Sequence, residues 1–359
     1  MDTLEISSSP NAEKPGNLMF LGFFNPGGLF PFYSAIKYQS YDKIALLTGQ
    51  PNQRAHCTTD SGTCIRLTEV SLMSQYDIFT GLLKVFPLPV KKQDDVDFLF
   101  IFKHPKYEML KAKYPIVDIA GNGDDFSKAV NLLNWVSSNI YHMGNYSGAI
   151  PANAISYLDH AFGKDSAQGI NCVGLSTILS ECLLSIGIKA RKVFIMPCSP
   201  YDADNHVVVQ AYIKEMGKWV MLDPTFNAYI NNAQGDCLSL LELRHHLADQ
   251  APVFFNTDAK YNDEEWTEDS AKANIEYFAK NLFYFQLSEI STFSDENEPT
   301  GSAMNRFITL CPHGFSPKLV RISNVEYRRK QYGEQPWMVQ ALENEKDSKY
   351  FFCSSTDFE

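Results

Sequence analysis

The sequence predicts an α+β fold in which helices pack on an antiparallel β-sheet, with an additional β-rich region on the N-terminal side. Three observations predict this class. Apolar residues recur at three- and four-residue spacing through the middle of the chain, as in helices with one buried face. Strand-like runs follow at 190–196, 206–213 and 219–222, and the last two are joined by a tight turn, which predicts a hairpin. Residues 41–104 favour strands and show little helical period.

The chain has 359 residues, more than a usual single domain, so two units or one elaborated domain are expected. We assign 1–115 to the β-rich N-terminal region, with strands expected in KIALLTG, TCIRLTEVSLM, FTGLLKVFPLPV and VDFLFIF. We assign 116–300 to the catalytic core. Residues 301–359 form a tail whose strand-like runs RFITL, KLVRIS and KYFFC are candidates for pairing with the N-terminal region.

The core elements follow in order. Asp124 is a capping residue for a first helix, whose buried face comprises Phe126, Ala129, Val130, Leu133, Val136 and Ile140. A second helix is expected over 152–161. A third begins at Cys172, ends near Gly187 and buries the stripe Leu175, Ile178, Leu179, Cys182 and Ile186. The three strands come next, and helices are expected at 238–247 and 270–283.

Composition excludes several classes. The hydrophobic fraction of 45% and the charged fraction of 20% are those of a folded globular protein. The formal net charge of −11 disfavours nucleic acid and anionic membranes as partners. The first residues lack the features of an export signal, and prolines and glycines interrupt the apolar stretch 18–36, so we expect a cytoplasmic protein without a membrane helix.

The eight cysteines are too dispersed for a disulfide framework. His56, Cys57 and Cys64 are too sparse for a zinc site, and we interpret the last two as ordinary thiols of a hairpin. We expect no metal and no cofactor. Among the histidines outside the motif below, His142, His160, His245 and His246 are interpreted as surface or internally satisfied residues.

Three residues form a pattern that carries chemistry. Cys172 stands at a helix start, where free N–H groups and the helix dipole stabilise a thiolate. His206 begins a strand and Asp223 ends the next one, on the same face, with Cβ atoms expected within about 5–8 Å. Asp223 can then fix the imidazole tautomer of His206. The pattern predicts a cysteine nucleophile, its base and an orienting carboxylate.

Two further features belong to this site. The Cys172 backbone N–H and the Gln168 side chain are candidates for the oxyanion hole. Gly174, inside the first helical turn, costs roughly 1 kcal/mol of helix propensity, and a close approach by substrate is one expected reason for it.

The motifs Asn171-Cys172, LLSIGIKARKV, 205–209 (NHVVV) and GKWVMLDPT, with the upstream helix around Trp135, resemble the transglutaminase-like superfamily. That superfamily has a core similar to papain-type cysteine proteases. The resemblance covers 120–230 well and 231–290 loosely, and it implies the same roles for Cys172, His206 and Asp223. Val173 stands where animal transglutaminases carry tryptophan, and no calcium sites or β-sandwich domains are evident. The chain looks more like the bacterial or archaeal branch.

The expected function is therefore a thiol enzyme that forms a thioester acyl-enzyme from an amide or other acyl carbonyl. The substrate is a protein, a peptide or a small amide, and the three residues do not encode whether water or an amine resolves the intermediate. The sequence defines no oligomeric state. The alternative is a non-catalytic scaffold with the same fold that binds a peptide or a glycan.

Overall fold

The computed structural model describes residues 74–146, 150–163, 169–202, 204–294 and 306–359, together with five short strands before residue 74. The chain divides into two units, Met1–Ser74 and Gln75–Glu359. In the first unit the expected run 43–49 contains strand β3 (Ala45–Leu46), and the expected run 63–73 contains strand β5 (Cys64–Arg66). The other residues of both runs lie outside the described part of this unit. Its strands form one three-stranded sheet and one hairpin: β1 (Phe20–Gly22), β2 (Ser34–Ile36), β3 (Ala45–Leu46), β4 (His56–Thr58) and β5 (Cys64–Arg66).

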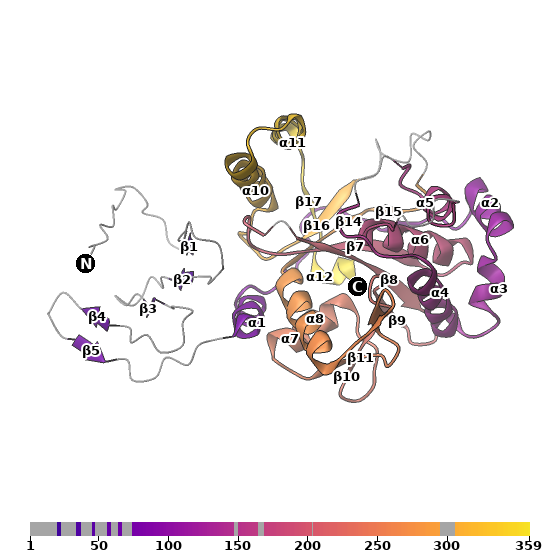
Figure 1. Cartoon of the computed structure of the whole chain (residues 1–359), viewed down its shortest axis with the longest axis horizontal. Coiled ribbons are helices and arrows are strands. Elements are labelled where there is room, and N and C mark those ends of the chain that lie inside the picture. The colour runs from indigo at the N-terminus through magenta and orange to yellow at the C-terminus, as the bar shows by residue number, and fades with distance from the viewer. Residues whose placement is uncertain are drawn as a thin grey trace. The chain divides into compact units, whose positions relative to one another are not determined.

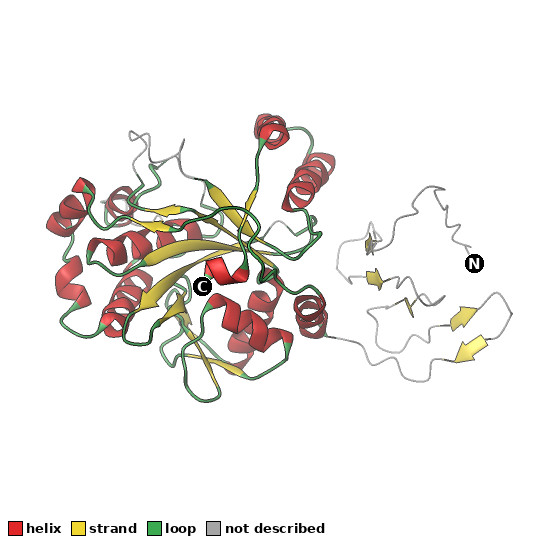
Figure 2. Ribbon diagram, turned by 180° about the vertical axis from the view of Figure 1, so that it is seen from behind, coloured by secondary structure: helices red, strands yellow, loops and turns green. Residues whose placement is uncertain are grey.

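A six-stranded sheet forms the centre of the second unit (Figure 2). Its order is β17-β16-β14-β7-β8-β9, and neighbours are antiparallel except for the parallel pair β16 and β17. The strands are β7 (Ala190–Met196), β8 (His206–Ile213), β9 (Lys218–Leu222), β14 (Tyr284–Ser288), β16 (Phe307–Leu310) and β17 (Phe351–Phe352). Helices packed on a largely antiparallel sheet confirm the expected fold class.

Helices α4 (Asp125–Asn139), α5 (Ala154–Ala161) and α6 (Cys172–Ser185) pack together on one side of this sheet (Figure 1). Asp124 caps α4 by accepting a hydrogen bond from the Ser127 backbone N–H at 2.8 Å. Every residue of α6 from 174 to 185 is buried. The helix is enclosed on all sides, so its apolar stripe does not mark one exclusive buried face.

The opposite side of the sheet carries a second core. Helices α1 (Gln75–Val85), α7 (Leu240–Ala248) and α8 (Glu268–Asn281) cover it, with the short C-terminal helix α12 (Ser355–Phe358). Because successive side chains of a strand point to opposite faces, Val208 packs in this core while Val209 packs beneath α6. The central sheet is therefore buried on both faces.

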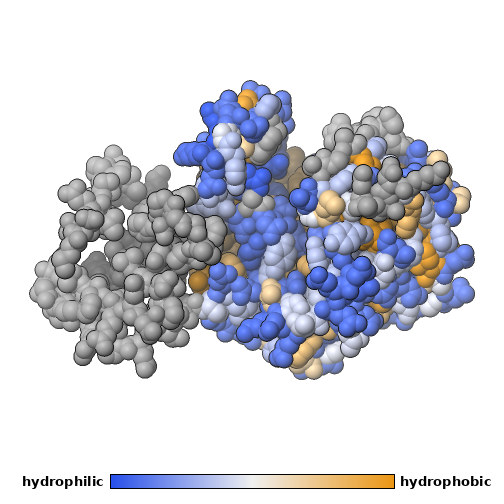
Figure 3. Space-filling view, in the orientation of Figure 1, coloured by the Kyte–Doolittle hydropathy of each residue, from blue (hydrophilic) through white to orange (hydrophobic). Residues whose placement is uncertain are grey.

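The remaining elements flank these layers. Helices α10 and α11 stand beside the sheet, and the surface over them is largely hydrophilic (Figure 3). The elements are α2 (Pro105–Lys113), α3 (Ile116–Ala120), α10 (Pro317–Tyr332), α11 (Pro336–Asp347), and the strand pairs β6 (Leu99–Phe100) with β15 (Ile290–Ser291), β10 (Ile230–Asn232) with β11 (Val253–Phe255), and β12 (Lys260–Tyr261) with β13 (Glu264–Glu265). Among the described residues, no helix is long and apolar enough to span a membrane.

Two strand expectations are wrong. The run FTGLLKVFPLPV lies largely in helix α1, because Phe79, Leu82 and Leu83 recur at helical spacing and pack on the second core. The run KLVRIS lies in α10, where Ser316 caps the first turn and Pro317 takes the first helical position. The other expected tail strands are β16 and β17, which extend the edge of the central sheet through β14.

Candidate active site

Cys172 is the first residue of α6 and is half-buried. Asn171 caps the helix, because its side-chain oxygen accepts a hydrogen bond from the Gly174 N–H at 3.1 Å. The first N–H groups of a helix have no intrahelical acceptor and carry a partial positive charge. This end of α6 therefore favours a negative charge on the Cys172 sulfur, and the Cys172 N–H is itself a free donor of the helix start.

Gly174 has a packing reason. A Cβ atom at this position would lie 3.1 Å from Ile170 Cδ1 and 3.3 Å from Tyr157 Cε1, and the residue is buried. The absence of a side chain thus lets the first turn of α6 pack against Ile170 and Tyr157. The expectation that substrate approaches the backbone at this glycine is not supported by these contacts.

His206 and Asp223 meet at one end of the β8–β9 hairpin. The register pairs Val209 with Leu222, so His206 and Asp223 are diagonal neighbours just beyond the paired residues. Their side chains are joined by a contact of 2.6 Å between His206 Nε2 and Asp223 Oδ2. Both residues are almost completely buried, with exposed fractions of 3% and 0%. A short contact of this kind orients the imidazole ring.

Asp223 is held by further bonds. Its second oxygen, Oδ1, accepts a hydrogen bond from the Thr225 N–H at 2.9 Å. Its backbone N–H donates to the Ala228 carbonyl at 2.7 Å, and the Ala228 N–H donates back to the Asp223 carbonyl at 3.0 Å. A buried carboxylate needs such donors to remain charged. Both carboxylate oxygens of Asp223 are therefore occupied, and the residue is fixed beside His206.

Aromatic rings enclose the His206 imidazole. The ring centroids of Phe226 and Tyr277 lie 5.6 Å from that of His206, and Phe278 lies at 6.2 Å. This burial by itself would lower the pKa of His206, since it removes water from the charged form. The negative charge of Asp223 and its hydrogen bond outweigh burial, helped by Cys172, and raise the pKa of His206 to about 10.

The Cys172 thiol is shifted in the opposite direction. Burial would raise its pKa, but hydrogen bonds from the side chains of His142 and His206, together with the positive charge of His206, lower the pKa to about 6. Between about pH 6 and pH 10 the arrangement therefore favours a thiolate beside a protonated His206. A thiolate is the nucleophilic form of cysteine.

His142 is the residue that sequence reasoning missed. It lies next to Cys172, although its position in an irregular segment suggested a surface or satisfied histidine. A parallel β-bridge pairs His142 with Ile170, which lies two residues before Cys172, and this bridge holds the segment beside the start of α6. No periodic pattern marks it, and the one local signal is Gly169, where a Cβ would lie 2.5 Å from the Tyr141 carbonyl oxygen.

The other expected residues fall as follows. Gln168 lies outside the described residues. Cys182 is completely buried in the core beneath α6, as expected. The ring of His160 packs against Tyr146, with centroids 5.4 Å apart. Within the described part of the chain, no group of three histidine, cysteine or acidic side chains is placed to hold a metal ion.

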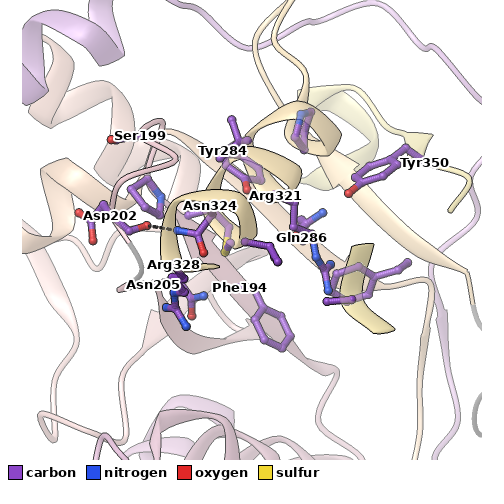
Figure 4. A pocket seen from close by; sticks show the side chains of 17 residues that line it. Phe194, Ser199, Asp202, Asn205, Tyr284, Gln286, Arg321, Asn324, Arg328 and Tyr350 are labelled. Carbon is purple, nitrogen blue, oxygen red and sulfur yellow. Dashed lines mark hydrogen bonds between the residues drawn. The ribbon is translucent and has the colours of Figure 1, made fainter. Parts of the chain in front are cut away.

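A cavity of about 560 Å³ adjoins the start of β8 (Figure 4). Asn205, which directly precedes His206, lines it together with Phe194 and Tyr284 of the sheet. Helix α10 closes the other side with Arg321 and Asn324, and the Asn324 amide donates a hydrogen bond of 2.7 Å to the carbonyl of Pro200. The lining mixes apolar rings with polar side chains.

Residues 116–224 match the family model of the transglutaminase-like superfamily. This range contains Cys172, His206 and Asp223, and also His142. The chain thus carries a transglutaminase-like domain, which confirms the resemblance seen in its motifs. No curated protein matches the chain.

Two solved structures are similar to parts of the chain. A candidate cysteine protease from Cytophaga hutchinsonii is 14% identical, with 47% of this chain and 59% of that chain covered and a TM-score of 0.26. A candidate protease from Parabacteroides distasonis is also 14% identical, with 62% of this chain and 42% of that chain covered and a TM-score of 0.25. The chain spans less than two thirds of the length of each.

Proposed function

We propose that this protein is a transglutaminase-like cysteine enzyme that acts on an amide or other acyl carbonyl through a thioester intermediate. Cys172 is the nucleophile, His206 the general base and acid, and Asp223 the group that orients His206. The observation that carries the proposal is the 2.6 Å contact of His206 with the buried Asp223, on the imidazole that also lowers the pKa of Cys172 to about 6. A nucleophile, a base and an orienting group in this order are the parts of a catalytic triad.

The reaction begins from the thiolate and the protonated imidazole. The Cys172 sulfur attacks the carbonyl carbon, a C–S bond forms, and the carbonyl electron pair moves to the oxygen. When this tetrahedral intermediate collapses, the bond to the leaving amine breaks and the amine takes the proton of His206. The products of this half are a thioester on Cys172 and a neutral imidazole.

The second half returns the enzyme to its starting state. His206 removes a proton from water or from an acceptor amine, whose oxygen or nitrogen attacks the thioester carbonyl. The C–S bond then breaks and the thiolate is released, beside an imidazole that is again protonated. Hydrolysis and acyl transfer differ only in this acceptor.

The backbone N–H of Cys172 is proposed as one donor to the oxyanion, because the helix start leaves it without an intrahelical acceptor. Gln168 stays a proposed second donor. We propose a protein, a peptide or a small amide as substrate, since each of them offers the acyl carbonyl that a cysteine nucleophile attacks. The net charge of −11 supports an enzyme without a nucleic-acid or anionic-membrane partner.

The test is acylation by an activated ester such as p-nitrophenyl acetate, followed by intact mass and by release of p-nitrophenol. The wild-type protein is expected to gain one acetyl group, mapped to Cys172, with a burst of product. Cys172→Ser should lose the burst. Cys198→Ser is the matched control, because burial raises the pKa of that half-buried thiol to about 11. If wild type and Cys172→Ser acylate alike, the enzyme proposal fails and the binding scaffold becomes the better account.

Adding a primary amine to the same assay separates the two acceptors. Acyl transfer predicts an amide product that grows with amine concentration, whereas hydrolysis predicts acetate at every concentration. The Cys172→Ser variant gives the direct reaction of the ester with amine and with water, and only product above that level counts as enzymatic.

A further inference from the structure

One ring nitrogen of His142 is paired with a hydroxyl group, and the other is buried without a hydrogen-bond partner among the described residues. Nδ1 lies 3.0 Å from the Tyr261 hydroxyl. Nε2 is buried and makes no hydrogen bond with any of the described residues. Since Nδ1 is engaged by Tyr261, Nε2 is the nitrogen left for the interaction of His142 with the Cys172 thiol.

The backbone around His142 is clamped. Its N–H donates to Asn262 Oδ1 at 2.7 Å, and the Asn262 amide donates back to the His142 carbonyl at 3.3 Å. Asn262 adopts a positive φ of 53° in the turn after β12. The residue before it, Tyr261, ends β12, so two neighbouring residues hold the backbone and the side chain of His142. Such an arrangement fixes the ring of His142 before any substrate arrives.

The segment is also tied to the strand that leads into α6. The Ile170 N–H donates to the Tyr141 carbonyl at 3.0 Å, and the Met143 N–H donates to the Ile170 carbonyl at 2.9 Å. Gly169 permits this approach, because a side chain there would collide with Tyr141. The bridge therefore ties His142 to Ile170, two residues before Cys172.

The tautomer follows from these partners. Burial raises the pKa of Tyr261, which keeps its hydroxyl protonated and able to donate. When Tyr261 O–H donates to Nδ1, a neutral imidazole carries its hydrogen on Nε2. That N–H has no hydrogen-bond partner among the described residues, and the Cys172 thiol interacts with the same side chain.

We propose that His142 is a second catalytic imidazole, held by Tyr261 with its hydrogen on Nε2, which donates to the Cys172 sulfur and stabilises the thiolate. His206 moves the proton, and His142 keeps its own. No bond is made or broken at His142 in this role. The proposal rests on the proposed function, because it assigns a role beside the same nucleophile.

The experiment measures the ionisation of Cys172 without any substrate, as the iodoacetamide alkylation rate against pH followed by peptide mass. His142→Phe removes the donor, and alkylation at pH 6 is expected to slow about fivefold, as a rise of about one unit in the Cys172 pKa would produce. His142→Gln offers an amide N–H in place of Nε2–H and should retain most of the wild-type rate. Tyr261→Phe should slow alkylation by less than His142→Phe. It removes the hydroxyl that fixes the tautomer of His142, but the His142 imidazole stays beside Cys172.

His160→Gln is the matched control. His160 is another histidine in contact with a tyrosine, Tyr146, and it has no part in lowering the Cys172 pKa. Its variant should alkylate like wild type. Far-UV circular dichroism checks that each variant is folded, and ¹⁵N chemical shifts of the His142 ring report the tautomer directly, even if His142→Phe does not fold.

The proposal is overturned if folded His142→Phe gives the wild-type curve, if His142→Gln is as slow as His142→Phe, or if the ring carries its hydrogen on Nδ1. Alkylation needs no turnover, so these outcomes are independent of the acyl-enzyme test. If wild type shows no acylation burst but His142→Phe still slows alkylation of Cys172, the proposed enzymatic function is rejected and the role of His142 is retained.

Discussion

Helix α6 carries two cysteines whose surroundings give them opposite properties. Cys172, at the first position, has a pKa lowered to about 6, while burial and the nearby charge of Glu181 raise the pKa of Cys182 far above its ordinary value. Both thiols are removed from water, and burial alone would raise both pKa values. Two imidazoles and the helix start reverse that effect at Cys172. The side chains around each thiol, rather than its burial, therefore decide whether that cysteine is reactive.

The same helix also handles charge in two ways. Glu181 is completely enclosed, and its two oxygens accept hydrogen bonds from the Ala154 N–H at 2.8 Å and the Ser294 N–H at 3.0 Å. This carboxylate links three segments and has no open side. The Cys172 sulfur, in contrast, is half-buried and sits at the helix start. Burial raises the pKa of Glu181 to about 7 in spite of these two hydrogen bonds, whereas the imidazoles beside Cys172 lower the pKa of its thiol to about 6.

The largest effect is expected from His206→Ala, which makes Cys172 more like Cys182. The variant lacks the His206 imidazole, which both transfers the proton and donates one of the two hydrogen bonds to the Cys172 sulfur. We expect the rate of acyl-enzyme formation to fall by about 10²–10⁴-fold. Stopped-flow release of p-nitrophenol measures it. A rate within a factor of a few of wild type would mean that His206 is not the base, and the folded state is checked by thermal unfolding.

A smaller effect is expected from Asp223→Asn, which keeps the size of the side chain and removes its charge. Because the charge of Asp223 and its hydrogen bond raise the pKa of His206 to about 10 against burial, their loss lowers that pKa. The protonated imidazole is then lost at lower pH, so the basic limb of the kcat/KM profile should move down by about 1–3 pH units. An unmoved basic limb would contradict the assignment of Asp223.

The smallest functional effect is expected from Cys182→Ser, which changes the unreactive cysteine of α6. Cys182 is completely buried among apolar side chains, and a hydroxyl without a partner there should cost about 1–3 kcal/mol in the free energy of unfolding. The alkylation rate of Cys172 should not change. Urea unfolding measures the stability, with Cys182→Ala as the control for lost volume. A serine variant as stable as wild type would show that this part of the core is not dry.

The sequence predicted the regular part of the core well, for a physical reason. Helix α4, helix α6 and the strand pair β8–β9 each carry a clear period and clear ends: the cap at Asp124, the glycine at 187 with φ 88°, and the turn at Gly217 with φ 64°. The diagonal placement of His206 and Asp223 follows from that hairpin by alternation alone. Local pattern and tertiary structure agree here.

Prediction was poorer where tertiary contacts decide. Residues 79–85 were expected in a strand, although Phe79, Leu82 and Leu83 recur at helical spacing and pack in the second core beside α7 and α8. His142 was missed because its place depends on Asn262 and Tyr261, which are about 120 residues away in sequence. When hydrogen bonds to residues far away in the sequence hold an irregular segment, the local sequence shows almost no pattern that predicts its position.

The most direct test of the account is the alkylation rate of Cys172 and Cys182 against pH in one sample, resolved by peptide mass. We predict that Cys172 reacts with an inflection near pH 6 and that Cys182 does not react while the protein is folded. In His206→Ala the Cys172 inflection should move upward. An inflection at the ordinary thiol value of about 8.5 in wild type, or the same curve in both proteins, would contradict the claim that the surrounding imidazoles make Cys172 the nucleophile.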